Sequence, residues 1–292
     1  MSHTTLISAE QLQALMASAA PLRIFDCSFD LTQPHAGQQH YLDAHITGAV
    51  YANLDTALSA KHGADSPSSG GRHPLPTRET FATWLSSVGL SNDMQAVVYD
   101  RNSVNYCGRL WWMLKWAGHA NVAVLDGGLQ AWTAAGGPLT TGQEPAFAPS
   151  NFALRQPLLG LVATKTIANN LGSPAQTLID ARGAARFSGE VEPLDPVAGH
   201  IPGALNRPFG NNIQANGKFK PAAVLKAEFE ALLAGRDPAS VVHHCGSGVS
   251  AVPNVLAMQI AGLGSTGLYA GSWSEWCSDT RRPVAQSFSE RP

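Results

Sequence analysis

The sequence predicts an α/β protein built as two similar halves, each a mostly parallel β-sheet flanked by helices. Three observations support this class. Short apolar strands alternate with helical segments along the chain, and motifs of the first half recur in the same order in the second. With 292 residues and 44% apolar content, the chain is long enough for two ordinary cores. Strand–helix alternation favours parallel strands with helices on both faces.

The first half begins with a helix and a strand. Ser8 is a suitable N-cap for a helix over residues 9–17, and the apolar run over residues 22–25 predicts a strand. Residues 33–39 are polar and predicted as a loop, and a short helix is expected over residues 40–44.

A long loop is predicted over residues 58–76, which are rich in Ser, Gly, Pro and His. Ordered loops of this length tend to serve function. The elements expected after it are a helix over residues 78–88 capped by Thr77, a strand over 96–99, a helix over 106–117, a strand over 122–125 and a helix that carries Trp132.

The second half repeats the first. The matching segments are residues 24–26 with 178–180, 45–49 with 200–204, and 127–132 with 271–276. The strand before Asp100 matches the strand before Cys245, and without a gap Asp100 falls where Cys245 falls. An aspartate cannot take up sulfur, and its charge repels anions. The first half is therefore predicted to be catalytically silent.

Two domains and a linker follow from this repeat. We predict an N-terminal domain over residues 1–138, a linker over residues 139–157, and a C-terminal catalytic domain over residues 158–292. The linker region contains Gly, Pro, Thr and Gln without periodicity, which is typical of a domain boundary.

The segment most indicative of chemistry is the loop that starts at Cys245. It follows an apolar strand over residues 241–244, contains two glycines, and leads into a helix expected over residues 251–261 with Ser250 as its cap. Glycines let the backbone curl so that several N–H groups face one anion. A cysteine at such a helix N-terminus is stabilised as the thiolate. The loop therefore predicts a sulfur nucleophile in an anion-binding cradle.

Other interpretations of this loop are weaker. A buried structural cysteine would not require Gly-Ser-Gly directly after it. Adjacent strand residues point to opposite faces, so His243, His244 and Cys245 do not form a zinc site. A cysteine-dependent phosphatase needs an arginine six residues after the nucleophile, where this chain has Ala251.

Composition restricts the class of partner. The net charge of −2 and pI near 6.5 give no basic surface for nucleic acid or an anionic membrane. Four widely spaced cysteines without a CxxC pair, and the lack of an apolar run of membrane-spanning length or a signal peptide, predict a cytoplasmic protein. No cofactor or metal is expected, because no Walker sequence, dinucleotide fingerprint or metal-ligand spacing is present.

The sequence Cys-Gly-Ser-Gly-Val-Ser-Ala at residues 245–251 resembles the active-site loop of the tandem-domain rhodanese superfamily, in particular its 3-mercaptopyruvate sulfurtransferase branch. The likeness extends to Gly-Ser-Trp-Ser-Glu-Trp at residues 271–276, Asp-Ala-Arg at 180–182 and Gly-His-Ile-Pro-Gly-Ala at 199–204. It covers nearly the whole chain. The resemblance implies two tandem rhodanese-like domains.

The resemblance also implies an activity. A transferase of this family takes a sulfane sulfur from 3-mercaptopyruvate as a Cys245 persulfide, releases pyruvate, and passes the sulfur to a thiol or cyanide. A thioredoxin-like reductant is a further possible partner. The alternatives are a thiosulfate:cyanide sulfurtransferase (rhodanese) and a non-catalytic rhodanese-like module that binds partners or senses redox state. A loop without Lys or Arg disfavours a dianionic donor such as thiosulfate.

Site residues follow from the same resemblance. The catalytic set is Cys245, Ser247 and His45, and the substrate-binding set is Arg186, Arg182, Gly246, Gly248, Val249 and Ser250. Two of these residues have structural alternatives. Arg182 could form an ion pair with Asp180 or Glu190, and His45 could bond its own turn. His73, in a His-x-Leu-Pro element like that of the family, could line the cleft.

One departure from the family concerns the substrate carboxylate. The mercaptopyruvate branch usually has a second arginine in a Pro-Glu-Pro-Arg segment, whereas this chain has Glu-Pro-Leu-Asp at residues 192–195. Carboxylate binding then needs another cation, for which Arg72, Arg101 and Arg207 are the candidates.

Overall fold

The computed structural model describes residues 2–61 and 67–287, and these fold as two compact units. Unit 1 comprises Met1–Ser68, Pro76–Leu158 and Ile213–Phe219. Unit 2 comprises Ser69–Leu75, Leu159–Asn212 and Lys220–Pro292. Each unit therefore includes one short segment from the other half of the sequence, an exchange that the sequence did not reveal.

The stretch predicted as a linker packs along unit 1. Its first residues form β7 (Leu139–Thr140), which pairs antiparallel with β3 (His45–Ile46). Farther on, the Ser150 N–H donates to the Ser86 carbonyl over 2.9 Å. These bonds satisfy backbone groups that a free linker would leave to water. The two-unit division of the chain thus falls between Leu158 and Leu159.

Unit 1 contains a five-stranded parallel sheet with the order β1-β6-β5-β2-β4. The strands are β1 (Leu6–Ile7), β2 (Leu22–Asp26), β4 (Ala49–Tyr51), β5 (Gln95–Tyr99) and β6 (Val122–Leu125). The helices are α1 (Ala9–Ala17), α2 (Ala36–Asp43), α3 (Arg78–Ser87), α4 (Cys107–Trp116) and α5 (Gly128–Ala134).

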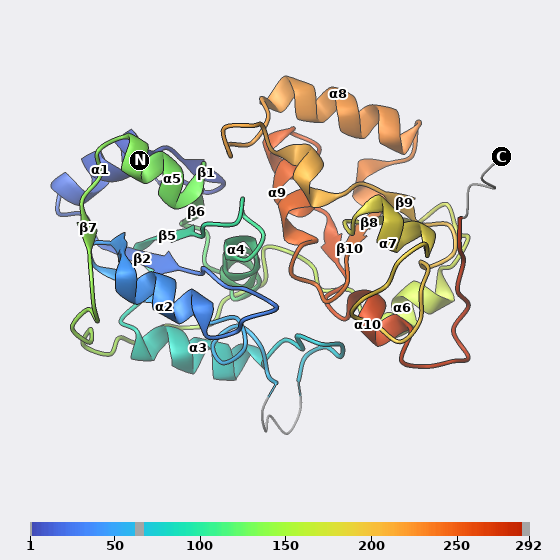
Figure 1. Ribbon diagram of the computed structural model, residues 1–292, viewed down its shortest axis with the longest axis horizontal. Coiled ribbons are helices and arrows are strands. Elements are labelled where there is room, and N and C mark those ends of the chain that lie inside the picture. Colours follow the sequence, from blue (N-terminus) through green and yellow to red (C-terminus); the bar gives the residue numbers. More distant parts are fainter. Residues whose placement is uncertain (1, 62–66, 288–292) are drawn as a thin grey trace. The chain divides into compact units, whose positions relative to one another are not determined.

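Helices cover both faces of this sheet. Figure 1 shows α1 and α5 on one side of β2 and β5, and α3 on the other. On the first side, Leu12 and Trp132 pack with Val97 in a buried apolar cluster. On the second side, Phe25 lies against Trp84 with ring centroids 5.8 Å apart. The strand–helix alternation of the sequence predicted this coverage of both faces.

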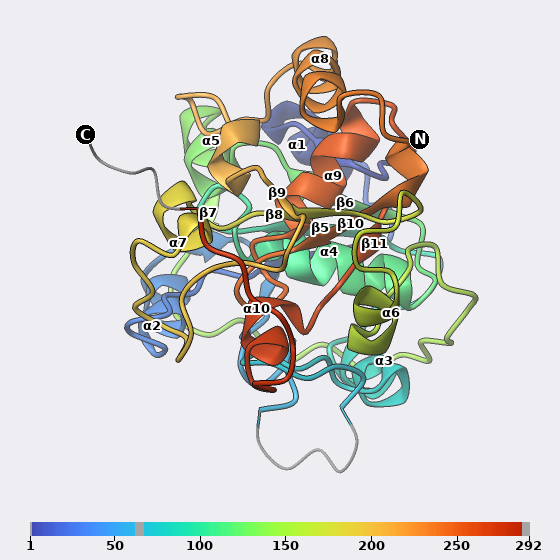
Figure 2. The same cartoon turned by 90° about the vertical axis from the view of Figure 1, so that its right-hand side faces the viewer.

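Unit 2 contains a four-stranded parallel sheet with the order β11-β10-β8-β9. The strands are β8 (Thr177–Asp180), β9 (Leu205–Asn206), β10 (Val241–His244) and β11 (Gly267–Leu268). The helices are α6 (Thr164–Asn169), α7 (Ala184–Ser188), α8 (Ala222–Leu233), α9 (Val252–Ile260) and α10 (Ser272–Trp276), with 3-10 turns η1 (Phe209–Asn212) and η2 (Pro238–Ser240). Figures 1 and 2 show α8 and α9 on one side of this sheet and α6 and α10 on the other.

Most predicted elements of the first half are present. Ser8 caps α1, and its capping box is completed by Gln11. The α2 helix differs from the prediction, because it begins at Ala36 inside the stretch predicted as a loop. Its apolar side is too narrow to produce a visible period, since only Gly37 and Tyr41 are buried.

The cap predicted for α9 is wrong. The helix begins at Val252, and its N-cap is Ala251 with helical φ and ψ of −75° and −28°. The turn of the preceding loop continues through Ser250, which moves the helix start by one residue. Within the described part of the chain, no helix is long and apolar enough to cross a membrane.

The loop after β5 is organised around the carboxylate of Asp100. This side chain is buried and accepts four backbone hydrogen bonds of 2.8–3.0 Å, two on each oxygen, from the N–H groups of Asn102, Val104, Tyr106 and Cys107. Ser103 and Val104 adopt left-handed φ values of 56° and 68°. The loop is therefore an anion cradle that is filled by its own residue.

We expect Asp100→Ala to destabilise the protein. The substitution leaves four buried N–H groups without their acceptor, and each unsatisfied group costs about 1–3 kcal/mol before water relieves it. The free energy of unfolding should fall by about 2–4 kcal/mol in urea denaturation. As a control, Asp43→Ala removes a carboxylate from the exposed side of α2 and should change stability by less than about 0.5 kcal/mol. Equal effects of the two variants would contradict the proposed role of Asp100.

Candidate active site

Cys245 directly follows β10, at the carboxyl edge of the unit 2 sheet. This edge is where open α/β sheets bind ligands. Two hydrogen bonds fix its backbone: the Cys245 N–H donates to Ser272 Oγ over 3.1 Å, and its carbonyl accepts from the Trp273 N–H over 3.0 Å. The N-terminus of α10 thereby holds the first residue of the loop in place.

Several amides of the loop have no acceptor. In the unit 1 loop, the amides two, four and six residues after Asp100 donate to its carboxylate. The equivalent N–H groups in unit 2, those of Ser247, Val249 and Ala251, donate to no acceptor among the residues that the structure describes. Unit 2 thus has an equivalent loop whose amides are not filled by a side chain of its own, although Val249 lacks the left-handed φ of its counterpart Val104. Unpaired N–H groups around a cysteine are suited to stabilise a thiolate and a persulfide anion.

Gly248 determines the curvature of this loop. Its φ is +73°, and a Cβ atom at this position would lie 2.1 Å from the Ala270 carbonyl oxygen. Ser103, at the equivalent position of the unit 1 loop, is also left-handed. Only glycine combines the left-handed backbone with the close approach of residue 270. The side chain of Val249 is buried in the core, and Ser250 lies in the turn before α9.

A histidine contacts the serine of the loop. His73 Nδ1 lies 2.8 Å from Ser247 Oγ, and both residues are buried. His73 belongs to the segment Ser69–Leu75, which unit 2 holds through two backbone bonds: Gly70 N–H to Glu275 Oε2 at 3.2 Å and Arg72 N–H to Ser274 Oγ at 3.0 Å. A His–Ser pair at this place can relay a proton.

Two guanidinium groups lie beside the residue that follows Cys245. A methyl group built on Gly246 would lie 2.9 Å from Arg72 Nη2 and 3.5 Å from Arg186 Nη1. The two side chains keep 28% and 21% of their surface exposed. They therefore place two partly exposed guanidinium groups next to the loop that begins at Cys245. Arg72 had been one of three candidates for the missing second cation.

The other two candidates are occupied elsewhere. Arg101 belongs to unit 1, where it pairs with Asp26 and donates to the carbonyls of His40 and Ala44. Arg207 is buried over the ring of Phe229, and it binds Asn212 and Glu228.

Carboxylates neutralise both arginines of the loop. Asp195 pairs through Oδ1 with Arg72 Nη1 and through Oδ2 with Arg186 Nη2, the latter at 3.2 Å. Glu192 binds the same Arg186 nitrogen at 2.6 Å. Burial acts to raise the pKa of Glu192, but the hydrogen bond from Arg186 and two backbone N–H groups lower it overall, so Glu192 is charged.

The contacts of Arg182 favour the structural alternative predicted for it, an ion pair, over a role in substrate binding. Its side chain is 1% exposed and lies over the ring of Trp273. Its guanidinium donates to Asp180, Glu192 and the Gly199 carbonyl. Burial alone would lower the pKa of Arg182, but the neighbouring Asp180 carboxylate raises this pKa overall. The predicted ion-pair alternative named Asp180 correctly, whereas Glu192 takes the place of Glu190.

The contacts of His45 favour the structural alternative predicted for it, a histidine that bonds its own turn, over a catalytic role. In unit 1 its ring is fully buried, stacks on Tyr41 at 3.9 Å, and donates from Nδ1 to the Tyr41 carbonyl at 2.7 Å. Its Nε2 lies 3.3 Å from Glu144. His200 in unit 2 stacks on Phe187 and bonds its carbonyl in the same way, at 3.8 and 2.7 Å. Both histidines fix equivalent turns of the repeat.

The histidines before Cys245 are buried on opposite faces of the sheet. His243 Nε2 lies 3.3 Å from Met258 Sδ on α9, and burial lowers the pKa of His243 to about 3. His244 lies 3.9 Å from Asp180 on the other side. These two rings are therefore part of the packing around β10.

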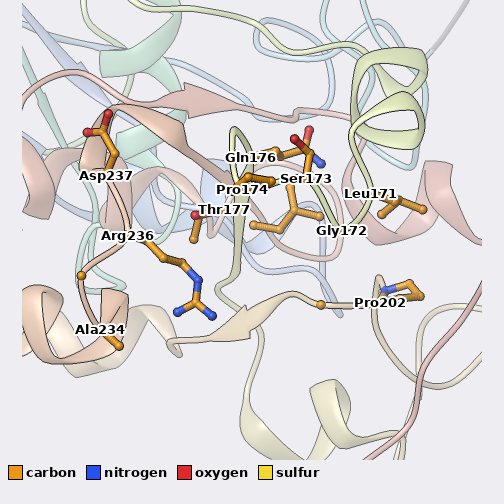
Figure 3. A pocket seen from close by; sticks show the side chains of 13 residues that line it. Leu171, Gly172, Ser173, Pro174, Gln176, Thr177, Pro202, Ala234, Arg236 and Asp237 are labelled. Carbon is orange, nitrogen blue, oxygen red and sulfur yellow. The ribbon is translucent and has the colours of Figure 1, made fainter.

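A cavity of unit 2 lies away from this site. It has a volume of about 670 Å³ and is lined by the loop before β8, the turn at residues 202–203 and the turn after α8 (Figure 3). Thr177, the first residue of β8, lies in its wall, whereas Cys245 follows the last residue of the neighbouring β10. The cavity thus lies at the amino edge of the sheet, and no Cys or His lines it.

Comparisons with known proteins agree with this geometry. The model of the rhodanese-like domain matches residues 8–135 and 163–279. A probable 3-mercaptopyruvate sulfurtransferase of Pseudomonas aeruginosa is 44% identical over 288 residues, which cover 98% of this chain and 99% of the relative. A putative thiosulfate sulfurtransferase, SseB, of Mycobacterium tuberculosis is 40% identical over 285 residues, 96% of each chain.

A solved structure is also similar over nearly the whole chain. The 3-mercaptopyruvate sulfurtransferase from Leishmania major superposes with a TM-score of 0.82 at 29% identity, covering 96% of this chain and 76% of that one. The two sheets, the cradle at Cys245 and the filled cradle at Asp100 are features of one repeated fold. The chain therefore belongs to the rhodanese-like family and carries two copies of its domain.

Proposed function

We propose that the protein is a 3-mercaptopyruvate sulfurtransferase with Cys245 as its nucleophile. The observation that carries this proposal is the open cradle of amides at residues 247, 249 and 251, with two arginines beside Gly246. Relatives of both the mercaptopyruvate and the thiosulfate class share the fold. The small molecules that it serves are a sulfur donor and a sulfur acceptor.

The transfer proceeds in two steps. The Cys245 thiolate attacks the sulfur of the donor, an S–S bond forms, and the C–S bond of 3-mercaptopyruvate breaks. The electron pair of that bond stays on the carbon fragment, which leaves as the enolate of pyruvate. The enolate takes up the proton that the donor thiol loses, and pyruvate is released. The persulfide is left as an anion in the cradle, and a thiol or cyanide then removes its outer sulfur.

The pair of Ser247 and His73 is placed to move that proton. The hydroxyl of Ser247 lies on the same loop as Cys245, and its contact with His73 Nδ1 gives the proton a second group to pass to. The proposal thus gives proton transfer to His73, whereas the family resemblance implies His45 as the catalytic histidine.

The carboxylate of the donor binds Arg72 and Arg186. A guanidinium offers two parallel donors to a carboxylate, and two such groups beside Gly246 hold the donor with its sulfur toward the loop. Thiosulfate is the second candidate donor, because Arg72 supplies a cation that the loop sequence lacks. The site resembles a 2-keto carboxylate site more closely, since the arginines lie at the loop edge and the cradle itself contains only amides.

The chemistry also favours a particular sulfur acceptor and a cellular compartment. A thioredoxin-like dithiol is a suitable acceptor, because it releases the sulfur as sulfide and closes its own disulfide. Such acceptors need a reducing compartment, so we place the protein in the cytoplasm. The four cysteines are unpaired and buried, which fits this placement.

Incubation with 3-mercaptopyruvate should add a single sulfur atom to Cys245. Intact-mass spectrometry followed by peptide mapping locates the added sulfur. Cys245→Ser should abolish the modification and all sulfur transfer, whereas Cys277→Ala should retain both, since Cys277 follows α10 and lies outside the loop. Function that survives in Cys245→Ser would support the non-catalytic alternative.

The donor preference should favour 3-mercaptopyruvate over thiosulfate by at least about tenfold in kcat/KM, which corresponds to about 1.4 kcal/mol in transition-state binding. Steady-state rates with cyanide as the common acceptor measure this ratio. A preference for thiosulfate of the same size would replace the proposed donor with the second candidate.

His73→Gln should lower kcat by about 10²–10⁴, the range for loss of a proton-transfer group, with a smaller change in KM. The matched variant is His45→Gln, in which the ring that bonds the Tyr41 turn is replaced; we expect lower thermal stability but unchanged kcat. The reverse pattern would restore the role that the sequence suggested for His45. Melting curves of both variants separate loss of chemistry from loss of fold.

A further inference from the structure

Asp195 has an unusual position for a carboxylate near an anion-binding site. Its side chain is only 3% exposed and bridges Arg72 and Arg186, with one oxygen on each. Its backbone N–H donates to Glu192 Oε1 at 3.2 Å, which holds the residue in this place. Asp195 therefore occupies guanidinium N–H groups that the carboxylate of an incoming substrate would use.

The charges around the loop balance. The positive groups are Arg72, Arg182 and Arg186, and the negative groups that pair with them are Asp180, Glu192 and Asp195. A substrate anion consequently meets a cluster in which three positive groups are balanced by three negative groups. Each negative charge on the substrate is repelled by Asp195, which lies between the two arginines beside Gly246.

We propose that Asp195 is a specificity-determining residue, which limits the site to sulfur donors with a single negative charge. The proposal rests on the function proposed above. Coulomb repulsion is proportional to the charge of the donor, so a dianion such as thiosulfate is penalised twice as strongly in free energy as a mono-carboxylate such as 3-mercaptopyruvate. The remaining guanidinium edges of Arg72 and Arg186 suffice for one carboxylate.

Removal of this charge should raise kcat/KM by different factors for the two sulfur donors. In Asp195→Asn, which keeps the size of the side chain, we expect kcat/KM to rise about threefold for 3-mercaptopyruvate and about tenfold for thiosulfate, because the second factor is about the square of the first. The ratio of thiosulfate to 3-mercaptopyruvate therefore rises about threefold.

Three further variants make the test specific. Asp195→Ser removes the charge with a different shape and should give the same shift in the ratio. Asp195→Glu keeps the charge and should leave the ratio unchanged. Glu230→Gln removes one charge from the exposed face of α8 and should also leave it unchanged.

The outcomes are distinct. The proposal is overturned if the ratio of kcat/KM for thiosulfate to that for 3-mercaptopyruvate is unchanged in both Asp195→Asn and Asp195→Ser. It is also overturned if kcat/KM falls equally for both donors, which would indicate that Asp195 only positions the arginines. If the wild-type protein forms no persulfide with either donor, as judged by intact mass, the proposed function falls and the role of Asp195 falls with it. A wild type that transfers sulfur while the variants leave the ratio unchanged removes only the role of Asp195.

Discussion

The structure of this protein depends on one backbone arrangement, a turn of N–H groups at the carboxyl edge of a parallel sheet. The N–H groups of such a turn need an acceptor, which is a group of the protein, water or a bound anion. In unit 1 the acceptor is the Asp100 carboxylate, which takes four amides. In unit 2 the equivalent position is Cys245, and the amides of Ser247, Val249 and Ala251 have no acceptor among the described residues. The loop of unit 1 thus holds a carboxylate of its own, whereas the equivalent loop of unit 2 begins with a cysteine and leaves its amides to a ligand or water.

Charge around the cradle is arranged in two layers. Arg182 is sealed beneath Trp273 with Asp180 and Glu192, so it supports the carboxyl edge of the sheet. Arg72 and Arg186 keep part of their surface exposed and lie beside Gly246. The inner arginine is fixed by its ion pairs, and the outer two are available to a ligand. Burial, more than residue type, separates these roles.

The histidines show why a repeat alone is an incomplete guide to function. His45 and His200 occupy equivalent turns, stack on an aromatic ring, and donate to its carbonyl. A motif that both halves of a repeat share is expected to be structural, and the contacts of both rings fit that expectation. His73 has no counterpart among the repeated motifs, and it contacts Ser247 from a segment distant in sequence.

The sequence by itself determined the two α/β sheets, their repeat and the cradle, because strand–helix alternation, glycine positions and the aspartate-for-cysteine exchange are local signals. It also predicted Cys245 and Arg186 as site residues, through the loop and the family resemblance, and it offered Arg72 and His73 as candidates without placing them. Only the tertiary structure showed that Ser69–Leu75 belongs to unit 2, which brings Arg72 and His73 to the loop. Contacts between residues more than a hundred positions apart depend on how the chain folds back, and no local pattern encodes them.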